Sequence, residues 1–233
     1  MSDFNKRKWI QGLLVLCFFL SGYFFFGHFY IQEPHMLPLT WVDKNTPLLP
    51  WTIWVYVSEY LIFLLLIFYA KTPQLMKRMI IAFSLCLGGS FVVFFLYPTI
   101  LPRDYLLHLE SQDFNLNVWM FNFIKTIDVP GNCFPSLHVA ICFLAGFVFL
   151  DVVPYRAVPL ILWTITICVS TLTTKQHYFY DIPSGFLLAL LSFMLSLVWV
   201  PWGVRNQGES RPFLNNWFQG DKKEFETAPN REL

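Results

Sequence analysis

The chain has 233 residues, of which 56% are hydrophobic and only 13% are charged, and its mean hydropathy is +0.51. A soluble domain usually carries about 25% charged residues, so this composition argues against an ordinary soluble enzyme and against a disordered chain. The formal net charge is only +1 and no basic stripe is visible, which argues against nucleic-acid binding. The composition is that of a membrane protein.

Six stretches with few or no charges are long enough to be membrane-spanning helices, which need about 20 residues each. In chain order they cover residues 9–32, 51–70, 79–102, 133–150, 157–174 and 182–204. The first is longer than the apolar part of a signal peptide and no small-x-small cleavage site follows it, so we expect it to be retained. The predicted fold is an all-α integral membrane bundle of six transmembrane helices over residues 1–204, followed by a polar tail over 205–233.

Lys and Arg are unevenly divided between the two predicted sides of the membrane. Twelve of the 16 lie before the first helix, after the second and fourth helices, or in the tail; the other four are Lys44, Arg103, Lys125 and Lys175. The positive-inside rule then places both termini in the cytoplasm. The connections after the first, third and fifth helices face outward, to the periplasm in a bacterium or to an organelle lumen in a eukaryote. The short chain without long insertions favours a bacterial inner (cell) membrane.

One outward connection contains His177 and Asp181, which are four residues apart and would share one face of a helix. An Asp that accepts a hydrogen bond from one imidazole nitrogen fixes the tautomer. The other nitrogen is then left as a nucleophile, a base or a ligand. The alternative interpretation is an interfacial His with a structural Asp partner.

A second outward connection contains Pro135, Ser136 and His138. Pro suits the first turn of a helix, where unpaired N–H groups favour an anion. Ser136 adds a hydroxyl donor, and His138 could donate a proton to a leaving oxygen. The alternative is an ordinary helix start with a buried, hydrogen-bonded His.

Arg103 and Lys175 add two cations to the same face, suited either to phosphate oxygens or to anchoring at the membrane surface. Together with the two histidines they fit phosphoryl transfer through a phosphohistidine, in which one His attacks phosphorus and the other protonates the leaving group. This scheme needs no metal and no cofactor. His138, His177 and Asp181 also have the donor types of a zinc site, but the nearby Arg103 and Lys175 would repel a cation.

These residues resemble the motifs of the type 2 phosphatidic acid phosphatase superfamily, which are Lys-x6-Arg-Pro, Pro-Ser-Gly-His and Ser-Arg-x5-His-x3-Asp. The first motif is reduced here to Arg103, and the resemblance covers roughly residues 9–200. The second and third motifs align with Pro135, Ser136, Leu137 and His138, and with Ser170, Thr171, His177 and Asp181.

The resemblance implies that His177 is the nucleophile, that Asp181 orients it, and that His138 is the general acid and base. It also implies that the phosphate is held by Arg103, by Ser136 and by the amides of Leu137 and His138.

Four positions depart from these motifs: Leu96, Asp104, Leu137 and Thr171 replace Lys, Pro, Gly and Arg. The Leu form of the second motif, together with Lys-Gln-His-Tyr at 175–178, is more similar to the branch that includes inositol phosphorylceramide and sphingomyelin synthases. We hypothesise that Lys175 supplies one of the lost charges.

We therefore expect a membrane lipid phosphatase that hydrolyses a lipid phosphate ester or pyrophosphate at the outer face, with lipid phosphate as substrate and membrane lipids as its surroundings. A lipid phosphotransferase is the alternative, because the two differ only in whether water or an alcohol enters second. A non-catalytic transporter or scaffold is a further alternative. A transporter would be expected to place polar groups near the midplane, where only Glu59 clearly lies. We expect Glu59 to face the bundle interior or an aqueous cavity.

Overall fold

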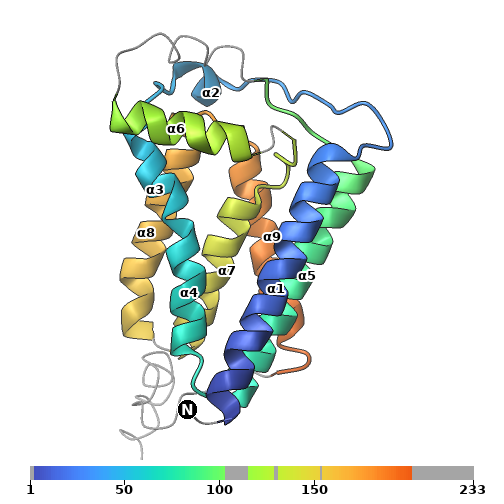
Figure 1. Cartoon of the computed structure of the whole chain (residues 1–233), viewed down its shortest axis with the longest axis vertical. Coiled ribbons are helices and arrows are strands. Elements are labelled where there is room, and N and C mark those ends of the chain that lie inside the picture. Colours follow the sequence, from blue (N-terminus) through green and yellow to red (C-terminus); the bar gives the residue numbers. More distant parts are fainter. Residues whose placement is uncertain (1–2, 103–114, 129–130, 153, 201–233) are drawn as a thin grey trace, which may run out of the picture.

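The computed structural model describes residues 3–102, 115–128, 131–152 and 154–200, with only the backbone for those between 151 and 156. The described residues form helices and connecting segments, with no strand among them. Most of the helices run along the long axis of the molecule (Figure 1). The all-α prediction is confirmed for this part of the chain.

Within the described residues, three stretches are long and apolar enough to cross a membrane: α1 (Asp3–His28), the stretch Pro50–Tyr69 and α5 (Pro73–Leu96). The second comprises η1 (Pro50–Thr52), α3 (Ile53–Val57) and α4 (Glu59–Tyr69). Shorter apolar helices correspond to the remaining predicted spans: α7 (Leu137–Val152), α8 (Pro154–Thr173) and α9 (Asp181–Ser196). These helices overlap the six predicted stretches but differ from them at the ends, whereas six membrane crossings and cytoplasmic termini stay predictions.

The helix α5 begins at Pro73, six residues before the predicted start of the third span. Its N-cap is Thr72, whose Oγ1 accepts the N–H of Leu75, and Pro at the first helical position suits such a start. The predicted span began after the charged residues Lys77 and Arg78, whereas the helix includes both of them. Arg78 is fully buried and donates from Nε and Nη2 to the carbonyl of Val200 after α9.

The helix α7 lies at the centre of the bundle, packed against α8 and α9 (Figure 1). It is apolar on all sides, as expected for a helix that other helices surround. Gly185 allows α9 to approach α7 closely, because a Cβ added there would lie 2.6 Å from the carbonyl oxygen of Ser136. This close crossing brings the start of α7 beside the start of α9.

Two short helices, α2 (Trp41–Asn45) and α6 (Leu116–Ile127), lie across the end of the bundle opposite the N-terminus (Figure 1). A capping box between Thr40 and Asp43 starts α2. The Leu49 N–H then donates to the carbonyl of Thr173, at 2.9 Å, and the hydroxyls of Thr52 and Thr173 lie 2.8 Å apart. These bonds fasten the segment after α2 to the end of α8.

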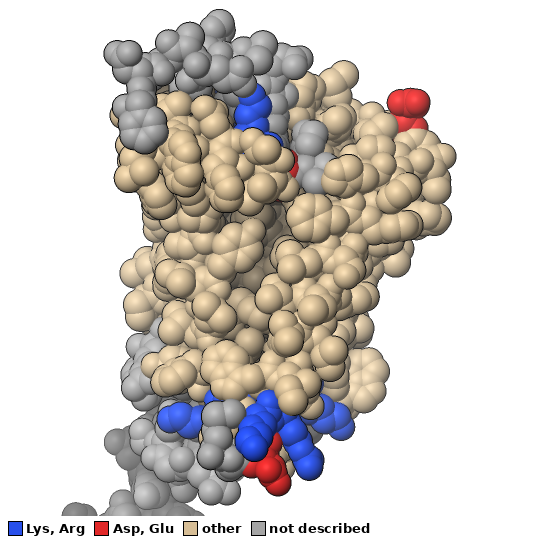
Figure 2. Space-filling model, in the orientation of Figure 1, with Lys and Arg blue, Asp and Glu red and all other residues tan. Residues whose placement is uncertain are grey.

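The described Lys and Arg side chains are divided between the two ends of the bundle. Near the N-terminus they gather below a middle band of almost entirely uncharged residues (Figure 2). Six belong to that end (Lys6, Arg7, Lys8, Lys71, Lys77 and Arg78), and three (Lys44, Lys125 and Lys175) belong to the end of α2 and α6. The tail residues 205–233 lie outside the described part of the chain.

Candidate active site

His177 lies in a hydrogen-bonded line between Asp181 and Ser136. Its Nδ1 is 3.1 Å from Asp181 Oδ2 and its Nε2 is 3.3 Å from Ser136 Oγ. Asp181 is fully buried and also accepts the backbone N–H of Tyr178 on Oδ2, at 2.9 Å. The carboxylate therefore fixes both the ring and the turn that carries it.

The predicted shared helical face for His177 and Asp181 is wrong, although their predicted pairing is present. Asp181 is the first residue of α9, and His177 precedes that helix in a turn closed by the bond from the Asp181 N–H to the Tyr178 carbonyl, at 3.1 Å. A turn before a helix start brings positions i and i+4 together as effectively as a helix does.

Pro135 is also placed differently from the prediction, because α7 begins only at Leu137 and the Phe134–Pro135 peptide bond is cis. Ser136 occupies the N-cap position, where its Oγ accepts the N–H of Val139 at 3.2 Å. The next N–H groups, those of Leu137 and His138, belong to the first turn and have no intrahelical acceptor. The start of α7 thus keeps the anion-binding character expected of it.

His138 lies beside this line, with its ring centroid 5.7 Å from that of His177. One face stacks on Tyr56, with centroids 4.2 Å apart and planes 21° apart. Its Nε2 is 3.0 Å from Glu59 Oε1, within ion-pair distance. Glu59 is only 3% exposed, which confirms that it faces the bundle interior.

A family model of the PAP2 superfamily, the type 2 phosphatidic acid phosphatases, matches residues 28–195. The chain belongs to this superfamily. No curated protein and no solved structure matches it. Since this superfamily comprises membrane phosphatases and phosphotransferases, its match and the apolar helices together identify an integral membrane protein with a phosphatase-type enzyme fold. The matched range includes Ser136, His138, His177 and Asp181, which meet at the starts of α7 and α9.

Lys175 shares a cavity of about 210 Å³ with His177 in this PAP2-superfamily site. Its Nζ donates to the carbonyl of Asp43 in α2, at 2.6 Å. Burial lowers the pKa of Lys175, and the nearby Asp43 carboxylate opposes that shift. Leu101 lines the same cavity, whereas Arg103 lies outside the described residues.

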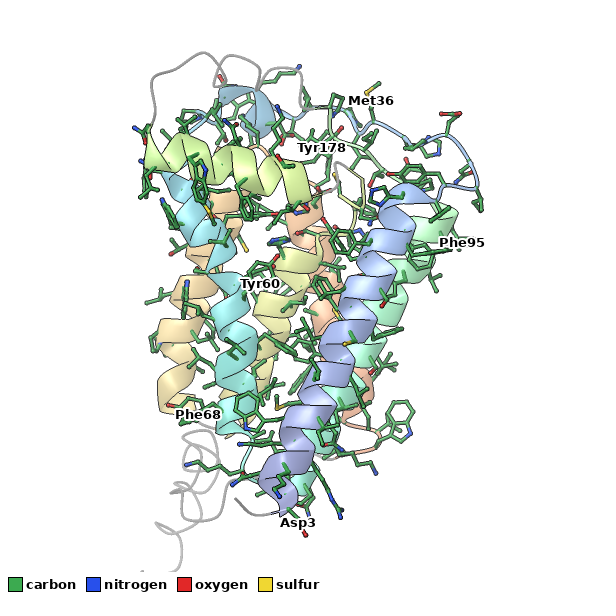
Figure 3. The ribbon with its side chains drawn as sticks, in the orientation of Figure 1. Asp3, Met36, Tyr60, Phe68, Phe95 and Tyr178 are labelled. Carbon is green, nitrogen blue, oxygen red and sulfur yellow. The ribbon has the colours of Figure 1, made fainter. Side chains whose placement is uncertain are left out.

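The turn that carries His177 is fixed to the segment that precedes Arg103. The hydroxyl of Tyr178 donates to the carbonyl of Ile100 at 2.9 Å, and burial raises the pKa of Tyr178 to about 12. The hydroxyl therefore stays protonated at neutral pH. Thr99 Oγ1 accepts the N–H of Phe134, also at 2.9 Å, and so links the same segment to the start of α7. Tyr178 lies at the end of the bundle that carries α2 and α6 (Figure 3).

An apolar groove runs from the side of the bundle to His138. It consists of two adjoining hollows of about 220 and 300 Å³, which share Leu16 and Phe19 of α1 and Tyr60 of α4. Glu59 lines the first hollow, and His138 lines the second. The hollow between α1 and α4 is visible in Figure 2, and Tyr60 lies about halfway along the bundle in Figure 3.

The presence of carboxylates next to His138 was not predicted from the sequence. Besides Glu59, Asp128 at the end of α6 accepts hydrogen bonds from the hydroxyls of Tyr23 and Tyr56. The signal for Glu59 was an ionisable residue in an apolar span, which is usually functional. Asp128 gave no such signal. No group of three or more His, Cys, Asp or Glu in the described part of the chain could hold a metal ion.

Proposed function

We propose that the protein is a lipid phosphatase that hydrolyses a phosphate ester or pyrophosphate of a membrane lipid through a phosphohistidine on His177, without a metal. The observation that carries the proposal is the buried line from Asp181 through His177 to the start of α7, with His138 beside it. Covalent phosphoryl transfer requires a nucleophile that a carboxylate orients. It also requires a nearby side chain that can give and take a proton, which is His138 here.

In the first step, His177 Nε2 attacks phosphorus and the bond from phosphorus to the leaving oxygen breaks, with its electron pair going to that oxygen. His138 gives the leaving oxygen a proton. In the second step, water attacks the phosphohistidine while His138 takes a proton from it, and the electron pair of the N–P bond returns to Nε2. Asp181 stabilises the positive charge on the ring throughout, through Nδ1.

The phosphate oxygens in this proposal are held at the start of α7 by the Ser136 hydroxyl and by the amides of Leu137 and His138. Lys175 contributes a charge from the wall of the His177 cavity, and Arg103 contributes another by its place in the family motif.

The lipid tail in this proposal follows the groove between α1 and α4. Its polar end is at His138, which serves the leaving oxygen, and its wall is apolar. A leaving group that carries a hydrocarbon chain can therefore stay in contact with apolar surface while its oxygen is protonated. The site then lies at the outer membrane face of a six-span bundle with cytoplasmic termini, as the distribution of Lys and Arg favours. The membrane in this proposal is a bacterial inner membrane.

A lipid phosphotransferase of the inositol phosphorylceramide and sphingomyelin synthase kind is the second candidate. The Leu at position 137 and the run Lys-Gln-His-Tyr at 175–178 favour it, because both are similar to that branch. A separate cavity is lined by His177 and Lys175, neither of which lines the groove. An alcohol bound there could replace water in the second step.

The proposal is tested by phosphate release from the purified protein in detergent, with EDTA present. Lipid phosphates and lipid pyrophosphates are supplied singly, and then together with a lipid alcohol as acceptor. We expect phosphate release from at least one lipid in EDTA. Transfer to the acceptor without phosphate release would instead establish the phosphotransferase, and loss of all turnover in EDTA would contradict a metal-independent mechanism.

Replacement of Lys175 by Ala should remove most of the activity, by about 10- to 100-fold, because a cation on the transferring phosphoryl group is lost. The measurement is kcat/KM for phosphate release. Lys44→Ala is the matched control, since Lys44 is exposed on the same end of the molecule beside Asp43. Near-normal turnover by the Lys175→Ala protein would remove Lys175 from the site.

Replacement of Gly185 by Ala should lower activity about tenfold or more, since the added Cβ would force the starts of α7 and α9 apart. Gly88→Ala is the matched control, because a Cβ at Gly88 meets no atom within 4 Å. We expect the Gly88→Ala protein to keep full activity. Equal activities of the two variants would show that the close crossing does not set the site geometry.

A further inference from the structure

Glu59 lies where a carboxylate is energetically expensive. It belongs to an apolar stretch long enough to cross a membrane and is almost fully buried. A charge in such a place is retained only when it is paired or serves a function. The partner within reach is His138, whose Nε2 is 3.0 Å from Oε1.

The fold provides dedicated support for this contact. The break between α3 and α4 at Ser58 places Glu59 at the first position of α4, and the Ser58 hydroxyl accepts the indole N–H of Trp163 at 2.8 Å. Tyr56, one turn earlier, stacks on the face of the His138 ring. The ring is thus held on one face by Tyr56 and at one edge by Glu59.

Asp128 is the other carboxylate near His138, but its two oxygens already accept hydrogen bonds from the hydroxyls of Tyr23 and Tyr56. Among the described residues Glu59 Oε2 has no hydrogen-bond partner, and Oε1 lies 3.0 Å from Nε2 of the imidazole. Of the two, Glu59 is therefore the carboxylate that acts on the ring.

We propose that Glu59 is a positioning residue for His138, holding its Nε2 so that Nδ1 delivers a proton to the leaving oxygen and later takes one from water. This inference rests on the proposed function and extends it by a second carboxylate–histidine pair. Asp181 serves the nucleophile, and Glu59 serves the proton carrier. In the first step the proton moves from Nδ1 to the oxygen that has just received the electron pair of the P–O bond, and in the second step Nδ1 regains a proton from the attacking water.

The test compares two phosphate monoesters that differ in their need for that proton. The alkoxide released from dodecyl phosphate must be protonated, whereas the 4-nitrophenolate released from 4-nitrophenyl phosphate is stable without a proton. In Glu59→Gln, the single-turnover rate of phosphoenzyme formation should fall about 100-fold with dodecyl phosphate and less than about threefold with 4-nitrophenyl phosphate. Hydrolysis of the phosphoenzyme should slow with both substrates.

Two further variants keep the test independent of folding defects. Glu59→Met has a similar length and leaves no charge to bury, and it should show the same dependence on the leaving group. The double variant Glu59→Gln/His138→Asn should be no slower than His138→Asn alone, because the two residues act as one unit. Thr164→Val is the structural control, since it removes a buried hydrogen bond to the α7 carbonyl of Cys142 without touching the site.

If Glu59→Gln slows phosphoenzyme formation equally from both substrates, or if the effects multiply in the double variant, the positioning role is overturned while the proposed function stays intact. The proposed function fails separately, if the wild-type protein releases no phosphate from any lipid phosphate or lipid pyrophosphate, or if a His177 variant still forms the phosphoenzyme. In that case the inference about Glu59 falls with it.

Discussion

The His177→Asn protein should form no phosphoenzyme and should release phosphate on the order of 10⁵-fold more slowly than the wild type, since loss of a covalent nucleophile removes the whole reaction path. Asn is chosen because its amide nitrogen can occupy the place of Nδ1 and keep a hydrogen bond to Asp181, which the wild-type ring makes at 3.1 Å. The measurements are the rate of phosphate release from a lipid phosphate and the amount of acid-labile phosphate bound to the protein after a rapid quench.

His28→Asn is the matched control for this experiment. His28 is the last residue of α1, is exposed, and has its Nδ1 2.8 Å from the carbonyl oxygen of Phe24 in the same helix. We expect this variant to form phosphoenzyme at the wild-type rate. Phosphoenzyme formation in the His177→Asn protein would show that another side chain is the nucleophile.

The second large effect is expected for Asp181→Asn, which should lower kcat by about 10³- to 10⁴-fold. A neutral amide cannot stabilise the positive charge that develops on His177, and it can present an N–H where the ring needs an acceptor. Because the carboxylate is fully buried, no solvent compensates for its loss. The measurement is the single-turnover rate of phosphoenzyme formation, together with the thermal unfolding midpoint.

The unfolding midpoint matters because Asp181 also accepts the backbone N–H of Tyr178. Ser184→Ala is the control, since the Ser184 hydroxyl donates to the carbonyl of Asp181 at 3.0 Å and not to its carboxylate. Loss of that bond should cost about 1 kcal/mol of stability and little activity. A wild-type rate in the Asp181→Asn protein would refute the orienting role, whatever its stability.

The amino-acid sequence by itself determined the class of protein and the approximate positions of the long apolar helices, but not the short helices α2 and α6. Apolar stretches of about 20 residues are a strong signal, because in a membrane a helix must satisfy its own backbone hydrogen bonds. The motif spacing also predicted that Asp181 pairs with His177, since four residues of chain restrict how far apart two side chains can lie. Details of local geometry were less predictable: Pro135 precedes α7, and His177 precedes α9.

Only the tertiary structure decided which residues from distant parts of the chain surround the two histidines. Glu59 and His138 are 79 positions apart, and nothing in their local sequence predicts a contact of 3.0 Å. Lys175 likewise contacts the carbonyl of Asp43 across the end of the bundle. Such contacts depend on how the helices pack, and packing is set by the complementary shapes of many side chains together, as the fit of Gly185 against Ser136 illustrates. Local periodicity and spacing carry no information about that fit.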